Sequence, residues 1–189
     1  MIELVVFLGN PGDRYSQTRH NAGRMVLETF TASAPPAWRE KFHGRIADIA
    51  FAERKIRFLV PETFMNLSGK STAAAAVFFK TDPKDILVVH DEVEMPFGSI
   101  GLRSGGGLAG HNGLKSVRDG LGTAEFGRLR VGIGRPTKGS MQSWVLGRFS
   151  PDEEAVLPLV LDAAARMLEE ALGNSDDGPP DAVTKDILE

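Results

Sequence analysis

Apolar runs alternate with segments of helical character along most of the chain. Continuous apolar runs rich in branched residues are typical of buried strands, and strict alternation is typical of a strand with two different faces. The segments that we predict as strands are 2–8, two within 45–60 around the polar break 53–55, 85–92, 99–103 and 128–134. The segments that we predict as helices are 22–32, 67–80, 111–121 and 150–172.

Two of the predicted helices carry recognisable start signals. Ser150, Pro151 and Glu153 form a capping box with proline at the first helical position. Ser68 is expected to cap the alanine-rich helix. Pro158 lies inside the last helix, where it should bend the helix or shorten its start.

Strands that alternate with helices predict a single-domain α/β fold. We expect a mixed, mostly parallel sheet with helices on both faces, because connections between parallel strands place helices there. The 189 residues are enough for one sizeable core. We expect one catalytic domain over 1–174 and a loosely attached acidic tail over 175–189, where glycine and proline interrupt the pattern.

Several polar loops follow predicted strands and should open onto one edge of the sheet. These loops are 9–21, 61–69, 90–97 and 104–113. In open α/β sheets, binding loops gather at the carboxyl ends of the strands. Five polar side chains are therefore expected to converge there: Asn10, His20, Asn66, Asp91 and Asn112.

A histidine beside a carboxylate suits general base catalysis. Neutral imidazole accepts a proton near pH 7, and an aspartate fixes its tautomer and stabilises the imidazolium. Asparagine amides can orient water or hold an oxyanion without adding charge. The chain has no GxSxG motif and no cysteine, which favours direct attack by water over a covalent intermediate. The alternative is that His20 only makes structural hydrogen bonds, as we expect of His43 and His90, and that Asn10 and Gly12 only permit a tight turn.

Composition and charge narrow the class of protein further. The absence of cysteine excludes disulfides and is compatible with the cytoplasm, and no run reads as a signal peptide or a membrane span. The net charge of -3 hides an asymmetry, since residues 152–189 hold 11 Asp and Glu against 2 Lys and Arg. The rest of the chain is therefore basic and could attract a polyanion. Charge alone favours the simpler explanation, a solvated acidic helix beside an ordinary surface.

Two motifs suggest other chemistry. Residues 90–92 with His111 could suggest a metal, but they lack the helical spacing of zinc motifs, and we expect neither metal nor cofactor. Gly105, Gly107 and Gly110 match the dinucleotide fingerprint GxGxxG, although the following strand ends without an acid to bind a ribose. Binding of NADP through Arg135 remains as an alternative.

Five ordered motifs resemble those of the bacterial-type peptidyl-tRNA hydrolase family. They are LGNPGDRYSQTRHNAG, PETFMNLSGKS, VVHDEVEMPFG, GGGLAGHNGLKS and FGRLRVGIGRP, and they span nearly the whole chain. The resemblance implies a monomer that hydrolyses, without metal, the ester between a peptide and the 3′ ribose of tRNA. Plastid relatives that bind RNA and act in splicing are the alternative within this family.

The resemblance also assigns roles by position. His20 matches the family's base, Asp91 its acidic partner and Asn10 the residue that helps to distinguish blocked from unblocked aminoacyl-tRNA. Arg103 and Arg130 match basic residues that clamp tRNA phosphates. The residues that match the peptide and 3′-terminal site are Tyr15, Phe64, Met65, Asn66 and Asn112. Leu108, Ala109 and Glu94 depart from the family's common residues, and the acidic C-terminal end makes a tail contact with tRNA doubtful.

Overall fold

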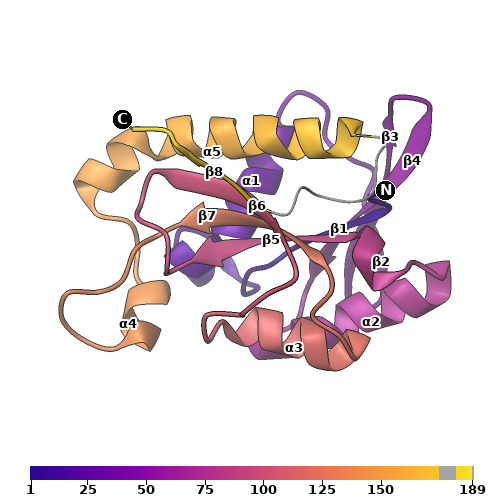
Figure 1. Ribbon diagram of the computed structural model, residues 1–189, viewed down its shortest axis with the longest axis horizontal. Coiled ribbons are helices and arrows are strands. Elements are labelled where there is room, and N and C mark those ends of the chain that lie inside the picture. The colour runs from indigo at the N-terminus through magenta and orange to yellow at the C-terminus, as the bar shows by residue number, and fades with distance from the viewer. Residues whose placement is uncertain (175–181, 189) are drawn as a thin grey trace.

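An eight-stranded mixed sheet forms the middle layer of the protein in the computed structural model, which describes residues 1–174 and 182–188 (Figure 1). The strands are β1 (Leu4–Phe7), β2 (Arg39–Lys41), β3 (Gly44–Phe51), β4 (Arg54–Pro61), β5 (Ile86–Glu92), β6 (Ser99–Ser104), β7 (Gly127–Gly132) and β8 (Ala182–Asp186). Their order is β2-β3-β4-β1-β5-β7-β6-β8. The four central strands β4, β1, β5 and β7 are parallel, and both outer pairs of strands are antiparallel. The expected mixed sheet is confirmed.

Helices cover both faces of this sheet, as predicted. Helices α1 (Ala22–Thr31) and α5 (Pro151–Gly173) lie on one face, and α2 (Ser68–Phe79) and α3 (Asn112–Leu121) lie on the other (Figure 1). The short helix α4 (Met141–Val145) lies apart from the sheet at the end of a long loop (Figure 1). The described residues also contain four short 3₁₀ turns: η1 (Asp13–Tyr15), η2 (Arg19–Asn21), η3 (Met65–Leu67) and η4 (Pro83–Asp85).

Strand β1 shows why the apolar runs are continuous rather than alternating. Val5 and Phe7 pack into the core under α1 and α5, whereas Leu4 and Val6 pack into the core on the α2 and α3 side. All four side chains are fully buried, because a central parallel strand is covered on both faces. Each contributes about 1.5–3 kcal/mol of hydrophobic stabilisation.

The helix starts confirm one prediction, correct a second and decide part of a third. The Ser150 hydroxyl accepts from the Glu153 amide, and the Glu153 carboxylate accepts from the Ser150 amide, so the capping box is present. Helix α5 runs unbroken from Pro151 through Pro158, so Pro158 does not shorten its start, and the bend stays a prediction. The loss of one main-chain hydrogen bond is tolerated within 23 residues. Ser68 is the first helical residue and not the cap, because its hydroxyl donates backwards to the Met65 carbonyl.

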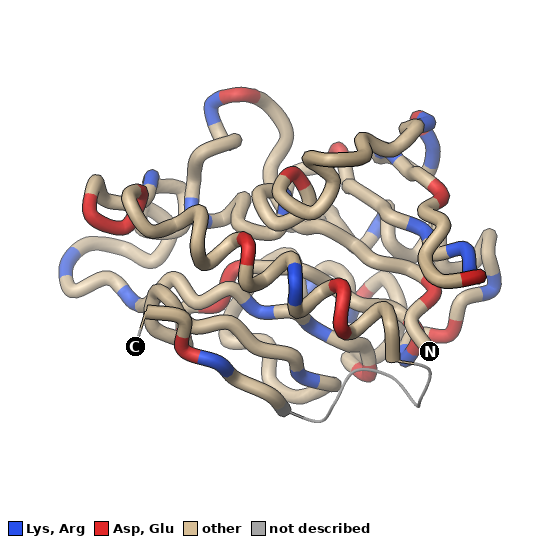
Figure 2. Tube along the Cα trace, turned by 90° about the horizontal axis from the view of Figure 1, so that it is seen from above, with Lys and Arg blue, Asp and Glu red and all other residues tan. Residues whose placement is uncertain are grey.

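The acidic C-terminal region is joined to the rest of the protein more closely than we expected. Residues 182–186 form β8, which pairs with β6, while the prediction for 175–181 lies outside the described residues. Acidic groups of α5 pair with basic groups elsewhere in the chain, for example Glu153 with Arg19 and Glu154 with Arg148. Charges of both signs are scattered along the trace (Figure 2). The charge asymmetry of the sequence is therefore not a separation in space.

Candidate active site

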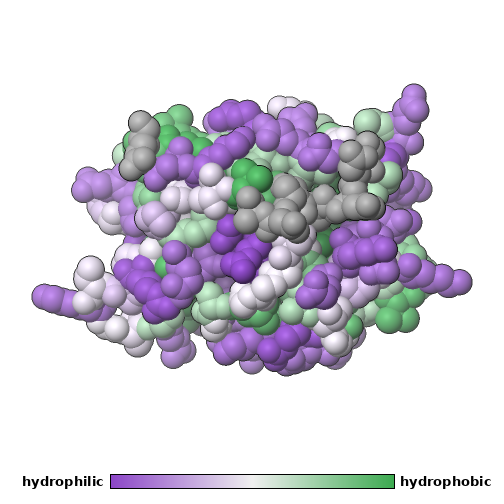
Figure 3. Space-filling view, in the orientation of Figure 1, coloured by the Kyte–Doolittle hydropathy of each residue, from purple (hydrophilic) through white to green (hydrophobic). Residues whose placement is uncertain are grey.

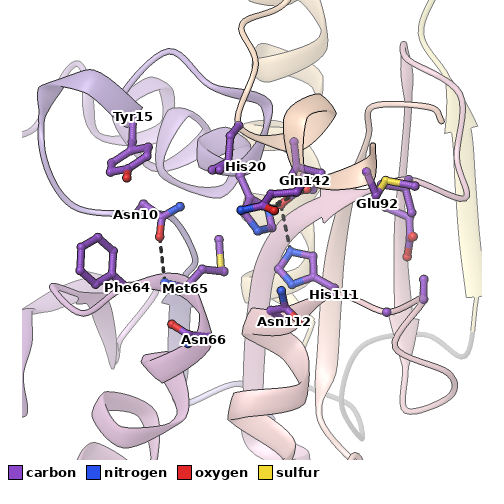
Figure 4. Close-up of a pocket in the computed structure, with 17 residues that line it drawn as sticks. Asn10, Tyr15, His20, Phe64, Met65, Asn66, Glu92, His111, Asn112 and Gln142 are labelled. Atoms are coloured by element: carbon purple, nitrogen blue, oxygen red, sulfur yellow. Dashed lines mark hydrogen bonds and ion pairs between the residues drawn. The ribbon is translucent and has the colours of Figure 1, made fainter. Parts of the chain in front are cut away.

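A cavity of about 610 Å³ opens at the carboxyl edge of the parallel strands. The expected residues that line it are Asn10, Tyr15, His20, Phe64, Met65, Asn66, Asp91 and Asn112. Figure 4 shows Asn10, Tyr15 and Phe64 on one side of this pocket and His20, His111 and Gln142 on the other. Eight of the ten predicted site residues are thus brought together.

Three of the four loops reach the pocket as predicted, and the fourth takes another route. Strands β4, β1 and β5 are parallel, so the segments that follow them leave at the same edge. Strand β6 is antiparallel to β7, so it ends at the opposite edge of the sheet. Residues 105–111 carry the chain back, and Asn112 enters the pocket from the first turn of α3 rather than from a strand end.

His20 and Asp91 form the central contact of the site. His20 Nδ1 lies 2.9 Å from Oδ1 and 3.0 Å from Oδ2 of Asp91. An ionised carboxylate only accepts hydrogen bonds, so Nδ1 is the protonated nitrogen of neutral His20 and Nε2 keeps its lone pair. His20 is 7% exposed and lines the pocket, while Asp91 is 1% exposed behind it. The arrangement provides a base with a fixed tautomer.

A second histidine, which the sequence analysis considered only as a metal ligand, completes the hydrogen bonding of Asp91. His111 Nε2 lies 2.9 Å from Asp91 Oδ1. The other nitrogen of His111 accepts from the amides of Gly113 and Leu114, at 3.1 Å and 3.3 Å, and so caps α3. Because Nδ1 accepts, Nε2 must carry the proton that it donates to Asp91. Helix α3 therefore fixes the tautomer of His111.

Burial and charge act in opposite directions on the pKa values of His20 and Asp91. Burial raises the pKa of Asp91, but the two histidines outweigh it through charge attraction and hydrogen bonds, and the pKa is held far below its usual range. Burial lowers the pKa of His20, but the attraction and the hydrogen bond of Asp91 outweigh it and raise the pKa above its ordinary value of 6.5. Asp91 is consequently ionised throughout the range in which His20 titrates.

Asn10 is held in one orientation by main-chain and side-chain contacts. The Asn10 amide donates to Oδ1 of Asn21 at 2.9 Å, and Nδ2 of Asn21 donates to the Asn10 carbonyl at 3.0 Å. Oδ1 of Asn10 accepts from the Met65 amide at 2.9 Å, as the dashed line in Figure 4 shows. This leaves Nδ2 of Asn10 as a donor that makes no hydrogen bond to any described residue.

The geometry also bears on metal binding. One donor atom each of His20, Asp91 and His111 lie within 4.8 Å of one another, a spacing compatible with a metal ion. However, the hydrogen bonds place protons on His20 Nδ1 and His111 Nε2, the atoms that would ligate. A metal would have to displace both protons and release the α3 cap. The donor set therefore does not suit a metal, and our expectation that none takes part remains a prediction.

Arg103 and Arg130 lie outside the pocket, on strands next to it. Together they form what we call the arginine surface, on the face of the sheet that carries α3. Arg130 is 9% exposed, and its Nη2 lies 3.4 Å from the hydroxyl of Thr184 on β8. Figure 3 shows a strongly hydrophilic area at the centre of the face where β6 and β8 lie nearest the viewer.

The glycine-rich loop has a structural explanation. The guanidinium of Arg128 is fully buried beneath the loop and donates to the carbonyls of Gly105 and Gly107. The dinucleotide fingerprint requires a parallel strand, loop and helix unit, and β6 is antiparallel. Arg135 pairs with Glu94 on the surface. The NADP alternative therefore lacks its structural context.

The two histidines expected to be structural are placed accordingly. His90 is 1% exposed, and its Nδ1 lies 2.6 Å from the Asp91 carbonyl oxygen. Burial, followed by the neighbouring His111, holds the pKa of His90 well below its ordinary value. His43 occupies a left-handed turn between β2 and β3, with φ of 55°. Neither His90 nor His43 is among the residues that line the pocket.

The sequence analysis missed two parts of the site. His111 precedes Asn112 directly, but histidine is an unusual helix cap, and only its contact with Asp91 reveals its role. The second part is α4, whose Met141, Gln142 and Val145 form one wall of the pocket. Its start carries an ordinary signal, since Ser140 accepts from the Ser143 amide as an N-cap.

The fold and this site define an α/β protein with a histidine and aspartate pair in a loop-built pocket, an arrangement suited to hydrolysis by water. The family model described as "Peptidyl-tRNA hydrolase" matches residues 4–184, and the chain belongs to this family. The peptidyl-tRNA hydrolase of Geotalea daltonii is 46% identical over 89% of this chain and 88% of its own length. That of Treponema pallidum is 50% identical over 83% of this chain and 80% of its own length.

A solved structure agrees with the sequence relatives. The crystal structure of peptidyl-tRNA hydrolase from Acinetobacter baumannii superposes with a TM-score of 0.81 at 36% identity. The match covers 90% of this chain and 86% of that one. None of the described helices is both long and apolar enough to cross a bilayer.

Proposed function

We propose that this protein hydrolyses the ester bond between an N-blocked aminoacyl or peptidyl group and the 3′ ribose of tRNA, using water activated by His20. The observation that carries the proposal is the His20 and Asp91 contact at 2.9 Å, beneath a pocket large enough for the end of such a substrate. Membership of the peptidyl-tRNA hydrolase family supports the substrate class. We further predict that the enzyme is a cytoplasmic monomer that recycles peptidyl-tRNA lost from the ribosome.

The first step uses the free nitrogen of His20. Nε2 accepts a proton from a water molecule as the water oxygen attacks the ester carbonyl, and a tetrahedral oxyanion forms. The resulting imidazolium donates through Nδ1 to Asp91, whose charge stabilises it. Because Asp91 stays ionised, the proton remains on His20 and is available for the second step.

The second step releases the tRNA. The tetrahedral intermediate collapses, the bond between the carbonyl carbon and the ribose oxygen breaks, and His20 returns the proton to that oxygen. The products are a free peptide carboxylic acid and tRNA with a free ribose hydroxyl. We propose that the amides of Asn10, Asn66 and Asn112, which line the pocket, place the water and hold the oxyanion.

Asn10 gives a physical basis for selecting blocked substrates. Its Oδ1 is occupied by the Met65 amide, so it presents Nδ2 as a donor. The amide carbonyl of a peptide can accept from this donor, whereas the ammonium group of an unblocked aminoacyl ester cannot. We propose that Tyr15 and the exposed Phe64 contact the same end of the substrate.

The arginine surface supports a contact with the tRNA backbone. Arg103 and Arg130 lie on adjacent strands. Burial lowers the pKa of Arg130, and the nearby charge of Arg103 lowers it further, whereas the charge of Glu92 acts in the opposite direction. Two cations held close together suit a phosphate, which both can contact. Glu92 also lines the pocket, so this surface adjoins the site.

The decisive experiment measures release of the acyl group from N-acetyl-aminoacyl-tRNA by the purified protein. Turnover of the blocked ester, with unblocked aminoacyl-tRNA left intact as the control, supports the proposal. Tight binding of tRNA without turnover of either ester would contradict it and favour an RNA-binding protein. Turnover that persists in the presence of EDTA supports a reaction without metal.

A further inference from the structure

Arg19 is a buried cation that the proposed mechanism does not use. It directly precedes His20 and is 5% exposed. Its Nη2 lies 2.6 Å from Oε2 of Glu153, and its Nη1 donates to the carbonyl of Arg148. Its guanidinium carbon lies 3.7 Å from the ring centre of Trp144. Burying a cation costs free energy unless partners replace its lost hydration. The Glu153 carboxylate, the Arg148 carbonyl and the Trp144 ring provide these partners for Arg19.

These contacts join three elements at one point. Arg19 belongs to η2 with His20, Trp144 belongs to α4, and Glu153 belongs to the first turn of α5. Glu153 also accepts from the Ser150 amide, so the carboxylate that holds Arg19 is itself fixed by the α5 cap.

The main chain reinforces the same junction. The Arg19 amide donates to the Gly147 carbonyl at 2.9 Å. Thr18 and Arg148 form an isolated antiparallel bridge. The segment that follows α4 is therefore fastened to η2 by both backbone and side-chain contacts, and η2 is the main element against which α4 packs.

Helix α4 stands between this junction and the pocket. Met141, Gln142 and Val145 line the pocket, and Gln142 lies beside His20 in Figure 4. Trp144 lies on the other side of α4, beneath Arg19, and its Nε1 donates to the Gly134 carbonyl at 2.9 Å. The wall is thus largely apolar toward the substrate and is held from behind by a cation and an indole ring.

We propose that Arg19 is a positioning residue that sets the apolar wall of α4 relative to His20 and thereby determines how well large apolar aminoacyl groups are hydrolysed. The inference rests on the proposed function. A displaced wall would let a large acyl group settle with its ester away from Nε2, and a shift of about 1 Å can cost about 10²-fold in rate. A small acyl group, which reaches the wall less, depends less on it.

The test compares Arg19→Gln with the wild type in a Trp38→Phe background, where Trp144 is the only tryptophan. We expect stronger acrylamide quenching of Trp144 in the variant. We expect kcat/KM to fall about 10- to 100-fold for N-acetyl-phenylalanyl-tRNA and less than about 3-fold for N-acetyl-glycyl-tRNA. The midpoint of the acid limb of kcat should not move, because the contact of His20 with Asp91 is intact. Arg39→Gln, at an exposed arginine of β2 paired with Asp48, is the matched control and should change none of these values.

A second pair of variants keeps the test decisive if Arg19→Gln folds poorly. Trp144→Leu leaves the pairing of Arg19 with Glu153 in place and removes the ring, whereas Trp144→Phe keeps an aromatic face for the cation. We expect Trp144→Leu to reproduce the selective loss on the phenylalanyl substrate and Trp144→Phe to restore most of it.

Equal losses on both substrates, or unchanged quenching of Trp144 in Arg19→Gln, would overturn the inference and leave the proposed function intact. Absence of hydrolysis of both substrates by the wild type would overturn the proposed function and the inference with it.

Discussion

Oδ1 of Asp91 lies 2.9 Å from Nδ1 of His20, although the two residues are 71 positions apart in the chain. The contact joins a 3₁₀ turn after β1 to the carboxyl end of β5, two adjacent parallel strands. Rigid neighbouring strands thus hold the proposed base and its partner without a covalent link, and most of the testable consequences depend on this contact.

Replacement of His20 by alanine should nearly abolish turnover and leave tRNA binding in place. Removal of a positioned base costs about 10²–10⁴ in rate, whereas the arginine surface lies outside the pocket. Single-turnover hydrolysis and a filter-binding assay with N-acetyl-aminoacyl-tRNA measure the two effects. His43→Asn, at a left-handed position that asparagine tolerates, is the control and should keep full activity. Retention of most activity by His20→Ala would refute the assignment.

Asp91→Asn should lower the plateau of kcat by about 10²-fold or more and move the acid limb to lower pH. The sign follows from the raised pKa of His20, whose neutral form is the base: activity is lost as the pH falls through that raised pKa. Without the charge of Asp91, burial lowers the pKa, so the limb moves down. A pH profile of kcat measures both effects, with Asp162→Asn on α5 as the control. An acid limb that stays in place would contradict the proposed coupling.

The two roles of His111, as a donor to Asp91 and as the cap of α3, can be separated by two substitutions. His111→Ala removes the α3 cap and the donor to Asp91, and should lower the free energy of unfolding by about 1 kcal/mol and reduce kcat. His111→Asn supplies a cap but is too short to reach Asp91, so it should restore stability without restoring kcat. Urea unfolding and steady-state kinetics on both variants test this. Equal recovery of stability and rate would show that His111 acts only as a cap.

Asn10→Asp should weaken the discrimination between blocked and unblocked esters. Its carboxylate still accepts from the Met65 amide, but it replaces the free Nδ2 donor with an anionic acceptor. An anion attracts the ammonium group of an unblocked ester and offers no donor to a peptide carbonyl. The ratio of kcat/KM for N-acetyl-aminoacyl-tRNA to that for aminoacyl-tRNA should fall by about 10-fold or more, a change of about 1.4 kcal/mol. An unchanged ratio would remove Asn10 from substrate selection.

Arg130→Ala should raise KM for peptidyl-tRNA and flatten its dependence on salt. Loss of one phosphate contact reduces the slope of log affinity against log salt by about 1. Measurements of KM between low and moderate salt concentrations give this slope. The control is Arg39→Ala on β2, the edge strand far from β7. An identical slope in Arg130→Ala and wild type would exclude a phosphate contact.

The central part of the fold was predictable because its signals are local. Continuous apolar runs mark β1 and β5, which are buried on both faces, and the capping box marks the start of α5. The short outer elements carried weaker signals. Strand β2 is three exposed residues, and β8 acquires its structure by pairing with β6, which no local pattern shows.

The candidate site was predictable to the extent that parallel strands bring their loops together. His20 and Asp91 follow this rule. Asn112 reached the pocket for a different reason, because β6 is antiparallel and the glycine-rich loop returns the chain across the sheet. His111 contributes because the start of α3 meets the end of β5. Arg19 contributes because η2, α4 and α5 meet at one point. Both contacts arise only in the tertiary structure, so no local sequence pattern predicts them.

Gly101 stands in register between Arg130 of β7 and Thr184 of β8. A Cβ at this position would lie 3.1 Å from both Nη2 of Arg130 and Oγ1 of Thr184, and 2.5 Å from the Val183 carbonyl oxygen. A slip of β6 by two residues would keep its faces but bring Ser99 or Arg103 opposite Arg130, where a side chain would block the guanidinium. The absence of a side chain at Gly101 therefore favours the correct alignment of the three strands over alignments shifted by two residues. A sheet shifted in this way would lose the Arg130 to Thr184 contact even if its core were intact.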